Sequence, residues 1–133
     1  MTVGIYISHA WGNHDDYYHR VCEMIRKTGS KFNDRTLSSV RFLETNSDTE
    51  IRREIRSRLD ATNVLLVIDT PVASRSYWMD FEMKEATERS IPIVAIVPQD
   101  SERGSLLVRD RATEFASWRT DSIVEAIKAA LAG

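Results

Sequence analysis

A tryptophan and a glutamate four residues apart, Trp78 and Glu82, are the side chains of this chain whose types and spacing best suit chemistry. Four-residue spacing on a helix stacks two side chains on one face, one turn apart. On a helical wheel Met79, Met83 and Ala86 form the apolar stripe, and Glu82 lies at its edge on the Trp78 side. Burial beside an aromatic ring changes the proton affinity of a carboxylate and strengthens its field on a nearby cation. The simpler interpretation, in which Glu82 only hydrogen-bonds a neighbour, stays open from this helix alone.

The length and composition of the chain predict one domain, residues 1–133, in the cytoplasm. Hydrophobic residues make up 42% of the chain and charged residues 29%, as in ordinary globular proteins. The net charge of −2 gives no basic field, so neither nucleic acid nor a membrane surface is expected as a partner. Cys22 is the single cysteine, which favours a reducing compartment. We expect no signal peptide and no membrane span, because the apolar runs are too short.

Short apolar runs predict the strands that must position this helix. Three of them are almost wholly apolar, as strands covered on both faces are. Strands are expected at residues 3–8, 40–43, 64–68, 93–97 and 114–116, and residues 30–39 are expected to be irregular.

Helical periodicity fills the gaps between these strands. Helices are expected at about 17–28, 50–60, 78–90 and 121–131, with a short helical turn near 106–108. Ser47 and Glu50 fit a capping box for the second helix. Thr120–Asp121 is expected to cap the last helix, whose predicted inner face is Ile123, Ala126, Ile127, Ala130 and Leu131.

The alternation of strand and helix predicts an α/β fold of the flavodoxin-like kind. This is a three-layer sandwich with a five-stranded, mostly parallel sheet and helices on both faces. Ligands of such sheets bind at the carboxyl ends of the strands. The helix of Glu82 begins at that rim, where its first-turn amides favour an anion. The rim comprises residues 8–16, 43–47, 69–76 and 98–103.

Several common chemistries lack their motifs. There is no Walker loop, and residues 8–12 stand where a dinucleotide fold would place its glycine-rich turn. No metal site is expected, because His9, His14 and His19 are five residues apart and do not align on a helix. A hydrolase built on Ser8, His9 and Asp69 lacks the strained nucleophile turn. A receiver-like phosphorylation switch at Asp69 lacks an acidic pair directly after the first strand, but remains an alternative.

The order of motifs along the chain resembles a TIR-like domain. The nearest type is the bacterial TIR-like proteins represented by the signal-producing subunit of the Thoeris anti-phage system. The motifs are Ser8-His-Ala-Trp11, the Ser-x-Trp-x-x-x-Glu spacing from Ser76 to Glu82, residues 91–98, and the closing Trp118 with its helix. Together they span nearly the whole chain.

This resemblance implies an enzyme that cleaves the bond between nicotinamide and ribose in NAD, with NAD as substrate and no cofactor or metal. Glu82 stands where the family's catalytic glutamate would lie. The family further implies an ADP-ribose-derived, cyclic or linear signal that reaches a separate effector, and self-association into a homo-oligomer. The implied substrate-binding residues are Ser8, His9, Trp11, Thr70, Ser74, Ser76 and Trp78.

Two departures from the family pattern leave alternatives open. Gly12-Asn13 stands in place of the Arg-Gly box of many animal and plant TIR domains, and residues 31–39 match nothing that would hold the adenine. A TIR fold also serves as a pure assembly module, so the fold does not establish activity. A non-catalytic interaction module is therefore the second hypothesis.

Overall fold

A computed structural model describes residues 2–10, 15–29, 31–38, 42, 44, 47–70, 76–98 and 106–133. Two predicted site residues, Trp11 and Ser74, lie outside the described residues. The strands are β1 Val3–Ser8, β2 Phe32–Asp34, β3 Val64–Ile68, β4 Ile93–Ile96 and β5 Glu114–Ala116. The helices are α1 Asp15–Arg26, α3 Asp48–Asp60, α4 Tyr77–Glu88, α5 Leu106–Arg111 and α6 Thr120–Ala132.

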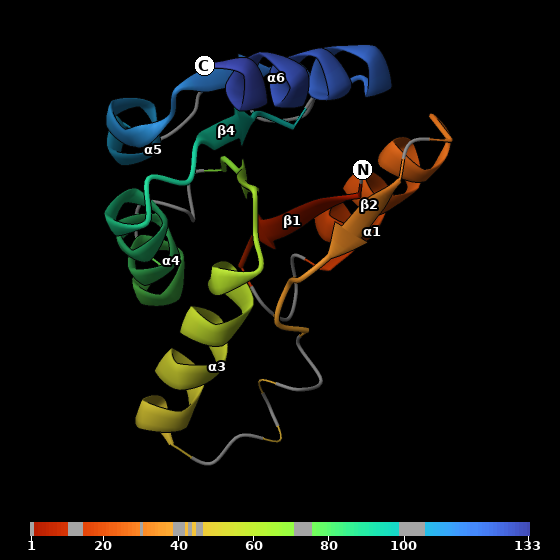
Figure 1. Cartoon of the computed structure of the whole chain (residues 1–133). Coiled ribbons are helices and arrows are strands. Elements are labelled where there is room, and N and C mark those ends of the chain that lie inside the picture. The colour runs from red at the N-terminus through yellow and green to blue at the C-terminus, as the bar shows by residue number, and fades with distance from the viewer. Residues whose placement is uncertain are drawn as a thin grey trace.

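The five strands form one parallel sheet in the order β2-β1-β3-β4-β5. Helices α1 and α6 lie on one side of this sheet, and α3 and α4 lie on the other (Figure 1). The predicted flavodoxin-like sandwich is therefore confirmed. Because all the strands run in one direction, their carboxyl ends share one edge, which carries Ser8, Asp69 and the start of α4.

Two apolar clusters, one on each face, hold the layers together. The face of α1 and α6 takes Ile5 and Ile7 of β1, whereas the face of α3 and α4 takes Tyr6. This division follows from the strand geometry, in which successive side chains point to opposite faces. Every residue of β3 and β4 is buried, as the apolar runs predicted.

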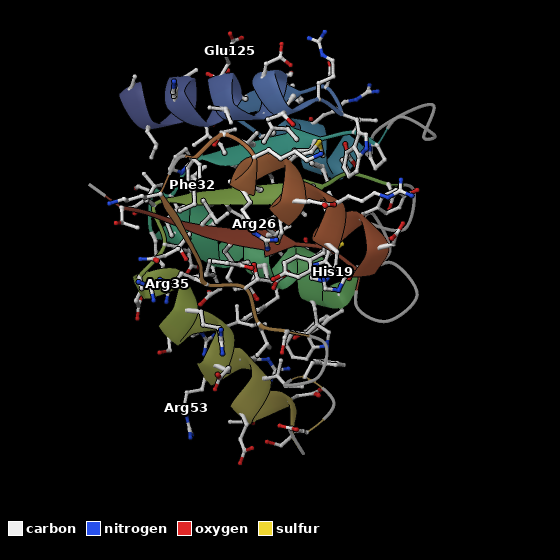
Figure 2. All side chains as sticks on the ribbon, turned by 90° about the vertical axis from the view of Figure 1, so that its right-hand side faces the viewer. His19, Arg26, Phe32, Arg35, Arg53 and Glu125 are labelled. Carbon is white, nitrogen blue, oxygen red and sulfur yellow. The ribbon has the colours of Figure 1, made fainter. Side chains whose placement is uncertain are left out.

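Charged side chains cover the outer surfaces of the helices. Figure 2 shows α1 in front of the sheet with His19 and Arg26, Glu125 on the outer side of α6, and Arg53 on the outer side of α3. Within the described helices, none is long and apolar enough to cross a bilayer.

The predicted second strand was wrong. The strand that pairs with β1 is Phe32–Asp34, within the stretch expected to be irregular. It lies at the sheet edge and is mostly exposed, so its sequence did not need to be apolar. Phe42, from the predicted strand 40–43, has helical backbone and packs against the α3 and α4 side of the core.

The last helix also differs from its prediction in two details. The residue at its N-cap is Arg119, which makes no side-chain capping bond, and Thr120 and Asp121 already belong to the helix. Leu131 is 41% exposed rather than part of the inner face. Val124, near the start of the helix, is buried although it was not among the predicted inner residues.

Candidate active site

The Glu82 carboxyl lies in the interior, against the end of the first strand. Its side chain is only 1% exposed. The Ser8 hydroxyl donates a hydrogen bond of 2.8 Å to Oε1 of Glu82, and this bond joins residues 74 positions apart in the sequence. The sequence left open whether Glu82 only hydrogen-bonds a neighbour; in the structure its carboxyl is buried at the sheet rim, with Ser8 as that neighbour.

Helix α4 fixes the height and rotation of Glu82. The Ser76 side chain accepts a hydrogen bond of 3.2 Å from the Met79 N–H, which makes Ser76 the N-cap of the helix. Met79 and Met83 are buried in the cluster between α3, α4 and the sheet. Because these anchors flank Glu82 in sequence, the carboxyl is directed at β1.

Strand β1 supplies two hydroxyl groups to this carboxyl. Tyr6 and Ser8 are two residues apart, so they share the face of the strand that looks toward α4. The Ser8 hydroxyl makes the bond described above. The Tyr6 side chain is completely buried, and its hydroxyl faces Glu82 closely enough to alter its ionisation.

Burial is the main cause of the unusual proton affinity of this site. It raises the pKa of Glu82 from 4.5 to about 8, against the opposing effect of the Tyr6 and Ser8 hydroxyls. Burial and the facing carboxylate likewise raise the pKa of Tyr6 well above 10. Glu82 is therefore mostly protonated at pH 7, and a cation placed beside it would favour its ionised form.

Among the other residues predicted to bind substrate, the described His9, Thr70 and Ser76 occupy the same rim. His9 is 3% exposed; its Nδ1 lies 2.9 Å from the Ile7 carbonyl, and its ring stacks on Tyr18 with centroids 4.7 Å apart. Thr70 is buried after β3. Ser76 serves as the α4 cap.

Trp78 belongs to an aromatic group at the start of α4. Its ring meets Phe42, Tyr77 and Phe81 edge to face, with centroids 4.9–6.3 Å apart. The Arg52 guanidinium lies 5.9 Å from the centroid of the Trp78 ring. Tyr6 is the aromatic residue whose hydroxyl faces the Glu82 carboxyl. The sequence analysis did not predict Tyr6 as a site residue.

Asp69, the residue of the alternative phosphorylation switch, is 1% exposed at the end of β3. Among the residues that the structure describes, no three His, Cys, Asp or Glu side chains are grouped so that they could hold a metal ion. The described part of the rim thus offers no carboxylate cluster for magnesium.

The chain matches one protein-family model. Residues 6–103 match the model described as Thoeris protein ThsB, TIR-like domain, and this range includes Tyr6, Ser8 and Glu82. A comparison with curated proteins finds no match.

Solved structures resemble this chain at low sequence identity. A 3-dehydroquinate dehydratase-like protein from Bifidobacterium longum is 16% identical, with 99% of this chain and 96% of that chain covered and a TM-score of 0.50. A diflavin flavoprotein A3 from Nostoc sp. is 14% identical, with 98% and 90% covered and a TM-score of 0.47. The first of these likenesses concerns the fold alone.

Proposed function

Since this chain belongs to the Thoeris ThsB TIR-like domain family, we propose that it cleaves NAD between nicotinamide and ribose, with Glu82 as the catalytic carboxylate. The observation that carries this proposal is the buried Glu82 carboxyl hydrogen-bonded to Ser8 at the carboxyl rim of the parallel sheet. Ligands of such sheets bind at this rim.

The chemistry asks for a fixed negative charge rather than a strong acid. When the glycosidic bond breaks, its electron pair goes to the nicotinamide nitrogen, so the ring leaves neutral and the ribose carries the positive charge. A carboxylate beside the ribose stabilises that oxocarbenium-like state, as carboxylates do in glycosidases. Water then adds to give ADP-ribose and one proton, or an internal hydroxyl or ring nitrogen closes a cyclic product.

The surroundings of Glu82 suit such a role. Its pKa of about 8 keeps the carboxyl mostly neutral at rest. The cationic nicotinamide ring of bound NAD favours the charged form, because an opposite charge at short range lowers the pKa of a carboxyl. The ionised carboxylate then acts in a site of low dielectric, where its field on the forming cation is strongest. Because Glu82 is 1% exposed, NAD binding has to be coupled to opening of the rim above it.

The remaining predicted residues complete the proposal as substrate contacts. Ser8 would hydrogen-bond the ribose together with Glu82, and Trp78 would wall the pocket against water. His9, Thr70 and Ser76 belong to the same rim, and Trp11 and Ser74 are proposed from the sequence alone. We further propose that the product is an ADP-ribose-derived signal of anti-phage defence, read by a separate effector, and that the protein acts in the cytoplasm without a cofactor.

Product analysis in ¹⁸O-labelled water tests this function. The purified protein is incubated with NAD, alone and with extract of phage-infected cells, and the products are resolved by mass spectrometry. We expect free nicotinamide together with either ADP-ribose that carries one ¹⁸O or an unlabelled cyclic isomer. Intact NAD under both conditions would remove the enzymatic proposal and leave a non-catalytic assembly module.

A further inference from the structure

The hydroxyl of Tyr6 is a buried polar group without a hydrogen bond. No hydrogen-bond partner of acceptable geometry lies near it among the residues that the structure describes. Within that described part of the chain, it is the one buried side-chain oxygen or nitrogen in this situation. Buried hydroxyls are normally bonded, because an unsatisfied one loses its water without compensation. A phenylalanine would fill the same space without this loss, so the hydroxyl requires an explanation beyond packing.

The surroundings of this hydroxyl point to Glu82. It faces the Glu82 carboxyl and the Leu37 backbone N–H, although neither contact reaches hydrogen-bond geometry in this conformer. Ser8, two residues along the same strand face, already donates to Oε1 of Glu82. Strand β1 therefore aims two donors at one carboxyl, and one of them is engaged.

We infer that Tyr6 is a positioning residue whose hydroxyl forms a hydrogen bond to Glu82 when the Glu82 carboxyl is ionised. When Glu82 carries a charge, the phenol donates a second hydrogen bond from β1. This fixes the carboxylate against the strand and leaves the charged group partnered inside the protein. The consequence for catalysis rests on the proposed NAD cleavage, whereas the contact itself does not.

The physical basis is the difference between neutral and charged acceptors. A hydrogen bond to an ionised carboxylate is shorter and roughly twice as strong as one between neutral groups. A short movement of the Tyr6 ring would bring its hydroxyl into hydrogen-bond distance of Glu82. The resulting bond stabilises the protein little while Glu82 is protonated, and considerably more once Glu82 is ionised. Such a donor lowers the proton affinity of the carboxyl, and the Tyr6 hydroxyl already lies close enough to Glu82 to lower its pKa to some extent before the bond is fully formed.

Other polar groups around the pair bear on the same equilibrium. Ser8 faces Glu82 from β1, and the charge of Arg58 in α3 acts on Tyr6. Asp69 is the other buried carboxyl at the rim. The members of the surrounding cluster from β3 and β4 are apolar, namely Leu65, Val67, Ile93 and Ala95.

Carbon-13 NMR titration of the Glu82 carboxyl tests this inference without any turnover. Protein labelled at the glutamate side-chain carboxyl carbon is titrated as wild type, Tyr6→Phe and Tyr77→Phe, with Glu82→Gln assigning the signal. Tyr77→Phe is the matched control, since its exposed hydroxyl accepts from Arg52. We expect Tyr6→Phe to raise the apparent pKa of Glu82 by about half to one unit and Tyr77→Phe to leave it unchanged.

An unchanged or lowered Glu82 titration in Tyr6→Phe would overturn the inference. Should Tyr6→Phe fail to fold, 3-fluorotyrosine provides the second measurement, because its more acidic phenol must lower the apparent pKa of Glu82. An unchanged or raised value there would also refute a donor role.

Activity supplies the functional readout. If ionised Glu82 cleaves NAD, Tyr6→Phe slows nicotinamide release at pH 7 by about three- to tenfold, while its rate approaches the wild-type rate at high pH. A shifted titration without NAD cleavage in any variant would reject the proposed function and keep the inference. NAD cleavage together with an unshifted Glu82 titration would keep the proposed function and reject the inference about Tyr6.

Discussion

Replacing Glu82 by Gln should change how the stability of the folded protein depends on pH. The folded protein holds the Glu82 proton up to about pH 8, whereas the unfolded chain releases it near pH 4.5. Between these values the folded state binds more protons than the unfolded state, so this group makes the protein less stable as the pH rises. The amide of Glu82→Gln cannot ionise, and it still offers an oxygen to the Ser8 hydroxyl.

The size of the effect follows from the displaced pKa. Each unit between the folded and unfolded values corresponds to about 1.4 kcal/mol, so wild type loses about 3 kcal/mol relative to Glu82→Gln between pH 4.5 and pH 7. Above the folded pKa of about 8 the loss levels off at about 5 kcal/mol. Domains of this size are stable by only roughly 5–15 kcal/mol in total, so the difference is large enough to measure.

Urea unfolding followed by tryptophan fluorescence provides the assay, since the chain contains three tryptophans. Unfolding free energies are compared between wild type and Glu82→Gln at pH 5, 7 and 9, which cancels the titration of all other groups. Glu88→Gln, at an exposed position of the same helix, controls for the loss of one carboxyl. A wild-type-to-variant difference that stays constant from pH 5 to pH 9 would refute a buried Glu82 with a raised pKa.

Three further substitutions test the elements that hold the site. Ser76→Ala removes the cap of α4 and should lower the unfolding free energy by about 1 kcal/mol, as circular dichroism melting would detect. Gly4→Ala should destabilise the protein more than this, because a Cβ there would clash with the Ala61 carbonyl oxygen; a variant as stable as wild type would contradict that packing. At Glu85, burial would raise the pKa, but its two arginine partners outweigh burial and lower it, so the ionised form stabilises the fold. This contribution is present above pH 4.5 and is lost as the pH falls through the lowered pKa of the folded state, so Glu85→Gln should be less stable than wild type by about 1 kcal/mol at pH 7, and this difference should shrink in acid.

Much of the fold could be read from the sequence because its inner strands are buried on both faces. The continuous apolar runs of β1, β3 and β4 can be recognised as strands from their own sequence, without knowing which strands lie beside them. The edge strand β2 carries no such signal: it is three residues long and exposed, and its pairing with β1 defines it. The apolar run at residues 40–43 was mistaken for that strand. Phe42, which belongs to this run, has helical backbone and packs its side chain against the core.

The candidate site was predicted in part, for a related reason. Helical spacing identified Glu82 as the unusual acid of α4, and strand order placed Ser8 at the same rim. Tyr6 could not be distinguished, because a strand buried on both faces shows no polar alternation that marks one face. Its position two residues before Ser8 was the available signal, since such residues share a face. Only the tertiary pairing of β1 with α4 shows that this face looks at Glu82.

The rate of nicotinamide release by Glu82→Gln at saturating NAD tests the central claim most directly. Glu85→Gln serves as the matched control, because it removes another buried carboxyl of α4 that pairs with arginines instead. By analogy with other preorganised electrostatic groups, we predict a rate about a thousandfold below wild type for Glu82→Gln and a near wild-type rate for Glu85→Gln. A Glu82→Gln rate within about tenfold of wild type would contradict the assignment of Glu82 as the carboxylate that stabilises the ribosyl cation.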